Sequence, residues 1–253
     1  MPYKVQATSK TPALIIYLLD VSASMGQPLG DQRRIDVVVD ALKSALRQMV
    51  FRSTKGSRIS SRYRLAFFAY SDHVYDLLDG VKPVDQVARL GVPRLNPLRT
   101  TETAEAFAQA EKLLQEELFS LQSCPAPLVC HMTDGENTGD DPEPIVRRIR
   151  QMAVQDGPVL VENIFISDKV LNKPVTDPRK WSGILPDTKL ASKYARKLQS
   201  TSSPLPESYR MMMLEMGYNL DPRALMMLPG VNPELVAMGF QMSAATPVHP
   251  SSH

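Results

Sequence analysis

Leu14-Ile15-Ile16-Tyr17-Leu18-Leu19-Asp20-Val21-Ser22-Ala23-Ser24-Met25 is an apolar run that ends in one carboxylate and two hydroxyls. Six apolar or aromatic residues in a row, without polar alternation, indicate a strand buried on both faces, as in a parallel sheet that helices cover on each side. The polar residues then lie at the carboxyl end of this strand, where open α/β sheets bind their ligands. A carboxylate with two hydroxyls, and no His or Cys nearby, favours a hard cation such as Mg²⁺ or Mn²⁺.

The composition limits what the chain can be. Its 253 residues, 43% of them hydrophobic, can bury one full-sized core, so we expect one principal fold with extensions. Twenty-nine Lys and Arg against 27 Asp and Glu leave a net charge of +2, which predicts neither nucleic acid nor a membrane as partner. Residues 1–10 lack the apolar run of a signal peptide, no later run is long enough to cross a bilayer, and the two cysteines lack metal-site spacing. We therefore expect a cytoplasmic protein with reduced thiols.

Strands and helices alternate after the first strand. Apolar residues recur every three or four positions between Ile35 and Val50, which indicates a helix. Residues 65–70, 127–133 and 159–166 are further buried strands, and 74–78 follows 65–70 so closely that the two must form a hairpin. One strand therefore runs antiparallel, and we expect it at the sheet edge. This order predicts an α/β fold with a doubly wound, mostly parallel, Rossmann-like sheet.

The composition changes after residue 170. Prolines recur there, and eight of the thirteen methionines follow Tyr209. We expect a domain core over residues 1–170, a helical Pro- and Met-rich extension over 171–245 that packs on the core, and a disordered tail over 246–253. The methionines either fill irregular gaps in this packing or form a pliable docking surface.

Two later loops add oxygen ligands to the first. Thr100-Thr101-Glu102-Thr103 opens an amphipathic helix, and the strand at 127–133 is followed by Asp134-Gly135. If the strands are parallel, all these loops meet at one edge of the sheet. The candidate metal ligands are then Asp20, Ser22, Ser24, Thr101 and Asp134. A shell built mainly of neutral hydroxyls leaves the charge of Mg²⁺ incompletely neutralised, so we expect the site to attract a Glu or Asp side chain of a partner protein.

Asp20-Val21-Ser22-Ala23-Ser24 resembles the D-x-S-x-S of von Willebrand factor A-like (vWA) domains, and with Thr101 and Asp134-Gly135 it resembles their metal-ion-dependent adhesion site (MIDAS). The resemblance implies a doubly wound sheet with one antiparallel edge strand. It also implies that Ser22, Ser24 and Thr101 bind the metal directly and that Asp20 and Asp134 often act through water. Family members usually carry glycines before the metal-site threonine, whereas this chain has Leu98-Arg99-Thr100. Thr100 therefore stays an alternative to Thr101, and Arg99 can compete with the cation.

The function expected from these residues is an intracellular, metal-dependent protein-interaction module and not an enzyme. The chain resembles bacterial intracellular vWA proteins of stress-response or signalling clusters, such as the tellurite-resistance-associated type. That resemblance implies a kinase, phosphatase or ATPase from the same gene cluster as the partner. The alternative is a Mg²⁺-dependent phosphohydrolase with Asp20 as nucleophile, which is disfavoured because Ser22 stands where such enzymes carry a second acid. Without metal, Ser22 and Ser24 would serve as turn residues and Thr101 and Thr103 as helix caps.

Overall fold

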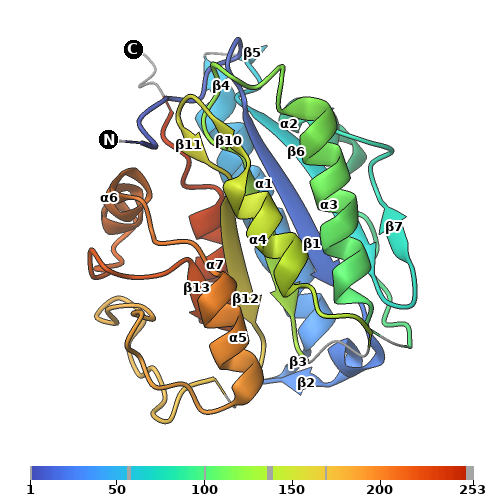
Figure 1. Ribbon diagram of the computed structural model, residues 1–253, viewed down its shortest axis with the longest axis vertical. Coiled ribbons are helices and arrows are strands. Elements are labelled where there is room, and N and C mark those ends of the chain that lie inside the picture. Colours follow the sequence, from blue (N-terminus) through green and yellow to red (C-terminus); the bar gives the residue numbers. More distant parts are fainter. Residues whose placement is uncertain (1, 56–57, 100, 136–138, 169, 249–253) are drawn as a thin grey trace.

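The middle layer of the protein is a seven-stranded mixed sheet whose main path has the order β13-β12-β9-β1-β6-β7 (Figure 1). The computed structural model describes residues 2–55, 58–99, 101–135, 139–168 and 170–248. Neighbours from β13 to β6 pair in parallel, whereas β7 and β8 pair antiparallel with β6. The strands are β1 (Ala13–Asp20), β6 (Tyr63–Tyr70), β7 (Val74–Asp76), β8 (Lys82–Pro83), β9 (Leu128–Thr133), β12 (Leu160–Phe165) and β13 (Met227–Pro229). The predicted doubly wound sheet with an antiparallel edge is confirmed.

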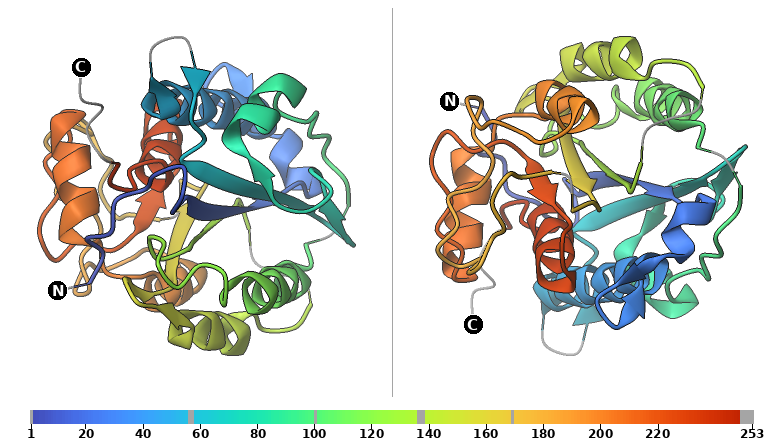
Figure 2. Two further views of the ribbon diagram at one scale, coloured as in Figure 1. Left: turned by 90° about the horizontal axis from the view of Figure 1, so that it is seen from above. Right: turned by 90° about the horizontal axis from the view of Figure 1, so that it is seen from below.

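Helices cover both faces of the sheet (Figure 2). All eight residues of β1 are buried, and alternate residues point to opposite faces. Ile15, Tyr17 and Leu19 join the core under α1, α2 and α7, whereas Leu14, Ile16 and Leu18 join the core under α3 and α4. The helices are α1 (Arg34–Ser53), α2 (Val84–Leu90), α3 (Thr103–Glu117), α4 (Glu143–Gln151), α5 (Lys193–Thr201), α6 (Glu207–Glu215) and α7 (Pro233–Ser243).

Short elements join the main ones. A 3₁₀ helix, η1 (Ala23–Gly26), follows β1 directly, and the hairpin of β2 (Pro28–Leu29) and β3 (Gln32–Arg33) leads into α1. Two more hairpins pair β4 (Thr54–Lys55) with β5 (Arg58–Ile59) and β10 (Ala153–Val154) with β11 (Gly157–Pro158). The elements η1, β2 and β3 lie at the carboxyl end of β1, at the bottom of Figure 1.

The C-terminal segment supplies part of the sheet. Three helices, α5, α6 and α7, lie within residues 171–245, but so does β13, which pairs in parallel with β12. Helix α7 packs against α1, and its Phe240 ring stacks on Tyr17 of β1 with ring centroids 5.8 Å apart. The predicted division at residue 170 therefore does not coincide with the edge of the sheet, because the last strand and its covering helix come after it.

The start of the expected tail is also tied to the fold. The amide of Ala7 donates to the carbonyl of Pro247 at 2.7 Å, and Ala7 forms an isolated parallel bridge with Val248. Thr246 lies 2.9 Å from the hydroxyl of Tyr209. Residues 246–248 thus differ from the predicted disorder, and 249–253 lie outside the described residues. Within the described ranges, no helix is both long and apolar enough to cross a bilayer.

Candidate metal centre

Asp20 ends β1 and is completely buried. Both of its carboxylate oxygens accept hydrogen bonds, one from the backbone amide of Ser22 at 2.8 Å and the other from the Thr133 hydroxyl at 2.7 Å. The pKa of Asp20 is raised to about 6, chiefly by burial and also by the nearby Asp134, while the hydrogen bonds from Ser22 and Thr133 limit this rise. The fold therefore holds this carboxylate in a fixed position where water solvates its negative charge poorly. A nearby cation would stabilise that charge.

Three oxygens form a row at the end of β1 and β9. The hydroxyl of Ser22 lies 3.0 Å from that of Ser24, which in turn donates to Oδ1 of Asp134 at 2.6 Å. Neighbouring oxygens of an octahedral Mg²⁺ shell lie about 2.9 Å apart when each metal–oxygen distance is about 2.0–2.1 Å. The spacing in this row therefore suits neighbouring positions of one Mg²⁺ shell, and the donor set is made of the hard oxygens that Mg²⁺ prefers.

Thr101 lies in the loop that crosses this edge of the sheet. Before Thr101, the amide of Leu98 donates to the carbonyl of Val21 at 2.6 Å. After it, the amide of Glu102 donates to the carbonyl of Ser71 at 2.8 Å. Thr101 is buried, and Glu102 occupies the N-cap position of α3, so neither predicted threonine is the helix cap. Thr100 lies outside the described residues, and the choice of Thr101 as the ligand stays a prediction.

Arg34 is a residue of this site that the sequence pattern did not indicate. It is the first residue of α1, and its guanidinium donates to Oδ2 of Asp134 at 2.8 Å. The Asp134 side chain is fully buried and that of Arg34 is 20% exposed. Arg34 thus brings a positive charge to the site, and the competition with the cation expected from Arg99 stays a prediction. Thr133, which holds Asp20, was missed as well, although its position next to Asp134 at the end of a buried strand is a usable signal.

The candidate ligands are oxygens and include none of the Cys or His side chains that softer metals favour. Among the described residues, no group of three or more His, Cys, Asp or Glu side chains could hold a metal ion. A MIDAS-like shell does not need one, because serine and threonine hydroxyls supply most of its oxygens. The chemistry of the residues present therefore fits Mg²⁺ or Mn²⁺ better than a softer metal.

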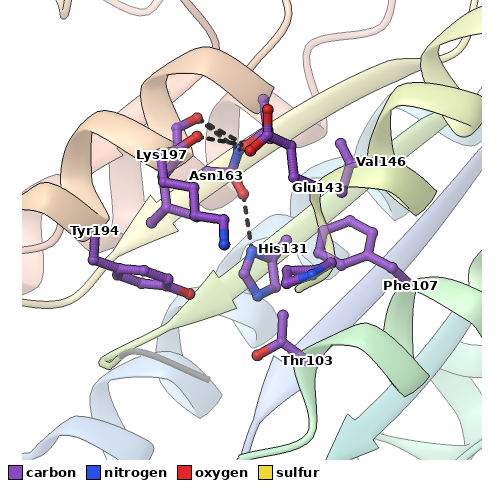
Figure 3. A pocket seen from close by; sticks show the side chains of 11 residues that line it. Thr103, Phe107, His131, Glu143, Val146, Asn163, Tyr194 and Lys197 are labelled. Carbon is purple, nitrogen blue, oxygen red and sulfur yellow. Dashed lines mark hydrogen bonds between the residues drawn. The ribbon is translucent and has the colours of Figure 1, made fainter. Parts of the chain in front are cut away.

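A small cavity lies on the opposite side of the sheet from α1, around His131 of β9 (Figure 3). One ring nitrogen of His131 lies 2.8 Å from the hydroxyl of Tyr70, and the other lies 2.8 Å from Oδ1 of Asn163. Burial lowers the pKa of this histidine to about 4, so the ring is neutral at pH 7. The cavity volume of about 10 Å³ has room for about one water molecule, so this cluster is a structural network and not a substrate site.

A larger groove opens beside the candidate metal centre. It has a volume of about 270 Å³, and its wall includes Val21, the residue after Asp20. The other lining residues come from β6, from β7 and the residue after it, and from the loop before α3: Ala69, Tyr75, Leu77, Arg94, Leu95, Asn96 and Leu98. Tyr75 and Leu98 are 41% and 39% exposed, so apolar surface is accessible within a few residues of the candidate metal ligands.

The sequence matches no protein-family model and no curated protein. Solved structures show similarity of fold. The pilus adhesin SpaC from Lactobacillus rhamnosus GG has a TM-score of 0.58 at 11% identity, over 92% of this chain and 30% of that one. The PilB minor pilin from Streptococcus sanguinis has a TM-score of 0.53 at 12% identity, over 93% of this chain and 62% of the pilin. PTMP1 from the mussel byssus, with a zinc-occupied MIDAS motif, has a TM-score of 0.42 at 19% identity, over 64% of this chain and 39% of PTMP1.

These similarities concern the fold alone, which agrees with the helix-covered, mostly parallel sheet with an antiparallel edge that the sequence predicts. The chain spans less than two thirds of the length of each of these proteins. The matches to SpaC and PilB each extend over more than nine-tenths of this chain. They therefore cover most of the segment after residue 170, in agreement with the place of β13 in the sheet.

Proposed function

We propose that this chain is a metal-dependent protein-interaction module that binds an acidic side chain of a partner protein. Mg²⁺ or Mn²⁺ would be held by Asp20, Ser22, Ser24, Thr101 and Asp134, with Thr100 as the alternative to Thr101. The observation that carries the proposal is the row of oxygens from Ser22 through Ser24 to Asp134, with neighbouring distances of 3.0 and 2.6 Å. When bound, the cation supplies a Lewis acid that can accept a carboxylate oxygen from outside the chain.

The protein's own residues prepare this site in advance. Thr133 and the Ser22 amide fix the two oxygens of Asp20, and the short η1 helix places Ser24 opposite Asp134. Neutral hydroxyls take up part of the shell without adding negative charge, which keeps the site attractive to a carboxylate of the partner. The neighbouring groove offers apolar contact to residues that flank this acid.

The same geometry supports a binding role over a phosphohydrolase with Asp20 as nucleophile. A nucleophilic carboxylate needs an oxygen that reaches the phosphorus atom. Asp20 is completely buried, and both of its oxygens accept hydrogen bonds within the fold. We therefore propose that the chain has no phosphatase activity of its own.

The cellular setting is proposed on other grounds. Cys124 and Cys130 are both buried and unpaired, which fits a reducing compartment such as the cytoplasm. A bacterial stress-response or signalling assembly, with a kinase, phosphatase or ATPase as the partner, stays a prediction from the sequence resemblance. The choice of Mg²⁺ or Mn²⁺ follows from the oxygen ligands of this chain and is not taken from the zinc of PTMP1.

Metal binding can be tested directly by titrating the protein with Mn²⁺ and following free Mn²⁺ by electron paramagnetic resonance. We expect one saturable site per chain, which Mg²⁺ displaces and which is lost in Ser22→Ala combined with Ser24→Ala. Ser120→Ala, an exposed serine just after α3, is the matched control and should bind as the parent does. Absence of saturable binding, or binding that survives the double serine variant, would contradict the proposal.

Acid recognition is tested separately by capture of partners from a lysate with Mg²⁺ or with a chelator. The proposal expects that at least one protein is retained only with Mg²⁺ and only by the parent and Ser120→Ala. An identical set of proteins from the parent, Ser120→Ala and the double serine variant, with Mg²⁺ and with chelator, would show that the metal centre does not mediate binding.

A further inference from the structure

Arg34 occupies the position in the candidate metal centre where its charge opposes a cation. Its guanidinium donates to one oxygen of Asp134 at 2.8 Å, while Ser24 donates to the other at 2.6 Å. We propose that Arg34 is a built-in counter-ion that competes with the divalent metal for Asp134. This inference rests on the proposed metal-dependent function, and it adds that metal binding requires the Arg34 guanidinium to leave Asp134.

The backbone around Arg34 fixes the direction of its side chain. The amide of Arg34 donates to the carbonyl of Gln27 at 2.9 Å, which closes the β2–β3 hairpin against the start of α1. The neighbouring Arg33 points the other way and pairs with Asp36 on the surface at 2.7 Å, with side chains 57% and 44% exposed. Two adjacent arginines thus have different surroundings, and only the second reaches the metal centre.

Burial makes the Arg34–Asp134 pair stronger than a surface ion pair. The Asp134 side chain is not exposed at all and that of Arg34 is only 20% exposed, so water screens the attraction poorly. A buried carboxylate needs a counter-charge, and in this structure the guanidinium provides it. A divalent cation at Asp134 would meet the same guanidinium at short range, and the two positive charges repel each other there.

The pair therefore lowers metal affinity and stabilises the metal-free protein at the same time. Replacing Arg34 by Gln keeps much of the side-chain length and removes the charge. We expect the dissociation constant of the variant for Mn²⁺ to be about tenfold lower than that of the parent. A change of this size is within the usual range of coupling between two bound groups. We also expect a lower midpoint of thermal unfolding without metal and a larger upward shift when Mn²⁺ is added.

The experiment compares Mn²⁺ titrations and thermal unfolding of the parent, Arg34→Gln, Arg34→Lys and Arg33→Gln. Arg33→Gln removes one positive charge from the same hairpin without touching Asp134, so it controls for the general effect of charge. Arg34→Lys keeps a charge on a shorter side chain and should give an intermediate dissociation constant. It also keeps the test available if Arg34→Gln does not fold.

Three outcomes separate the inference from the function on which it rests. Tighter Mn²⁺ binding by Arg34→Gln than by Arg33→Gln supports the inference. This comparison holds even if the parent binds Mn²⁺ too weakly to measure. Equal, saturable binding by the parent and all three variants overturns the inference and leaves the metal site standing. No binding by any of the four proteins refutes the metal site, and the inference falls with it.

Discussion

Glu162 predicts an unusual dependence of stability on pH. It lies in the middle of β12, is completely buried, and neither of its carboxyl oxygens has a hydrogen-bond partner in the described part of the chain. Burial raises its pKa well above the ordinary value of 4.5, and the neighbouring Cys130 thiol offsets only part of this rise. Burial also raises the pKa of Tyr17 and of Cys130, and neither a phenol nor a thiol can offer a positive charge to a Glu162 carboxylate.

The sign of the effect follows from proton binding. Because folding raises the pKa of Glu162, the folded protein holds this proton more tightly than the unfolded chain does. The tighter proton binding stabilises the folded protein fully below pH 4.5, and this contribution to the free energy of unfolding is lost as the pH rises towards the folded pKa. Between pH 4.5 and the folded pKa, each pH unit removes about 1.4 kcal/mol of this stability.

Glu162→Gln removes the titration and keeps the shape of the side chain. We expect the variant to be more stable than the parent at pH 7, by about 1.4 kcal/mol for each unit by which folding raises the pKa up to that pH, and each kcal/mol adds about 2–4 °C to the unfolding midpoint for a domain of this size. The difference should shrink to near zero at pH 4.5. Urea unfolding at several pH values measures it, with Glu116→Gln on the exposed face of α3 as control. A difference that does not change with pH, or a less stable variant at pH 7, would show that this reasoning is wrong.

Other parts of the structure give predictions of the same kind. Because burial lowers the pKa of His131 from 6.5 to about 4, the folded protein should lose about 3 kcal/mol of stability between pH 7 and pH 4 through this residue alone. Urea unfolding of His131→Gln should show a flatter pH profile, and an unchanged profile would contradict this. Thr133→Val removes one of the two donors to Asp20 and should weaken Mn²⁺ binding about tenfold in a folded protein, measured by the same titration, whereas equal affinity would show that Thr133 does not orient Asp20. Phe240→Ala in α7 should cost about 3–5 kcal/mol in urea unfolding, as for a core residue, and a loss below about 1 kcal/mol would place α7 outside the cooperative core.

The fold was predictable because its signals are local. The continuous apolar run of β1 and the short turn before β7 each determine one property of the sheet, burial on both faces and an antiparallel edge. Strand β13 was not predicted because it has only three residues, Met227–Pro229, with neither a β-branched residue nor an alternating pattern. Its pairing with β12 depends on contacts across the fold that no window of sequence contains.

The candidate site was predictable to the extent that its residues follow strand ends. Asp20, Ser22, Ser24 and Asp134 meet at one edge because β1 and β9 are parallel neighbours. Arg34 was not predictable in the same way, since Arg33 and Arg34 are identical in type and adjacent in sequence. Only the hairpin before α1 decides which of them turns inward, towards an acid 100 residues away.

The positive charge of Arg34 should have opposite effects on the binding of the metal and on the binding of an acidic partner to the metal-bound site. Asp20 and Asp134 carry negative charge when ionised, which offsets part of the charge of a divalent cation and reduces its attraction for a third carboxylate. A guanidinium displaced from Asp134 stays attached to the start of α1, close to the site, and adds a positive charge beside the bound metal. Arg34 thus weakens metal binding and strengthens the attraction of the metal-bound site for an acidic partner. A chain with this arrangement should bind metal and partner together more readily than it binds the metal alone, because the partner's carboxylate offsets the repulsion between Arg34 and the cation.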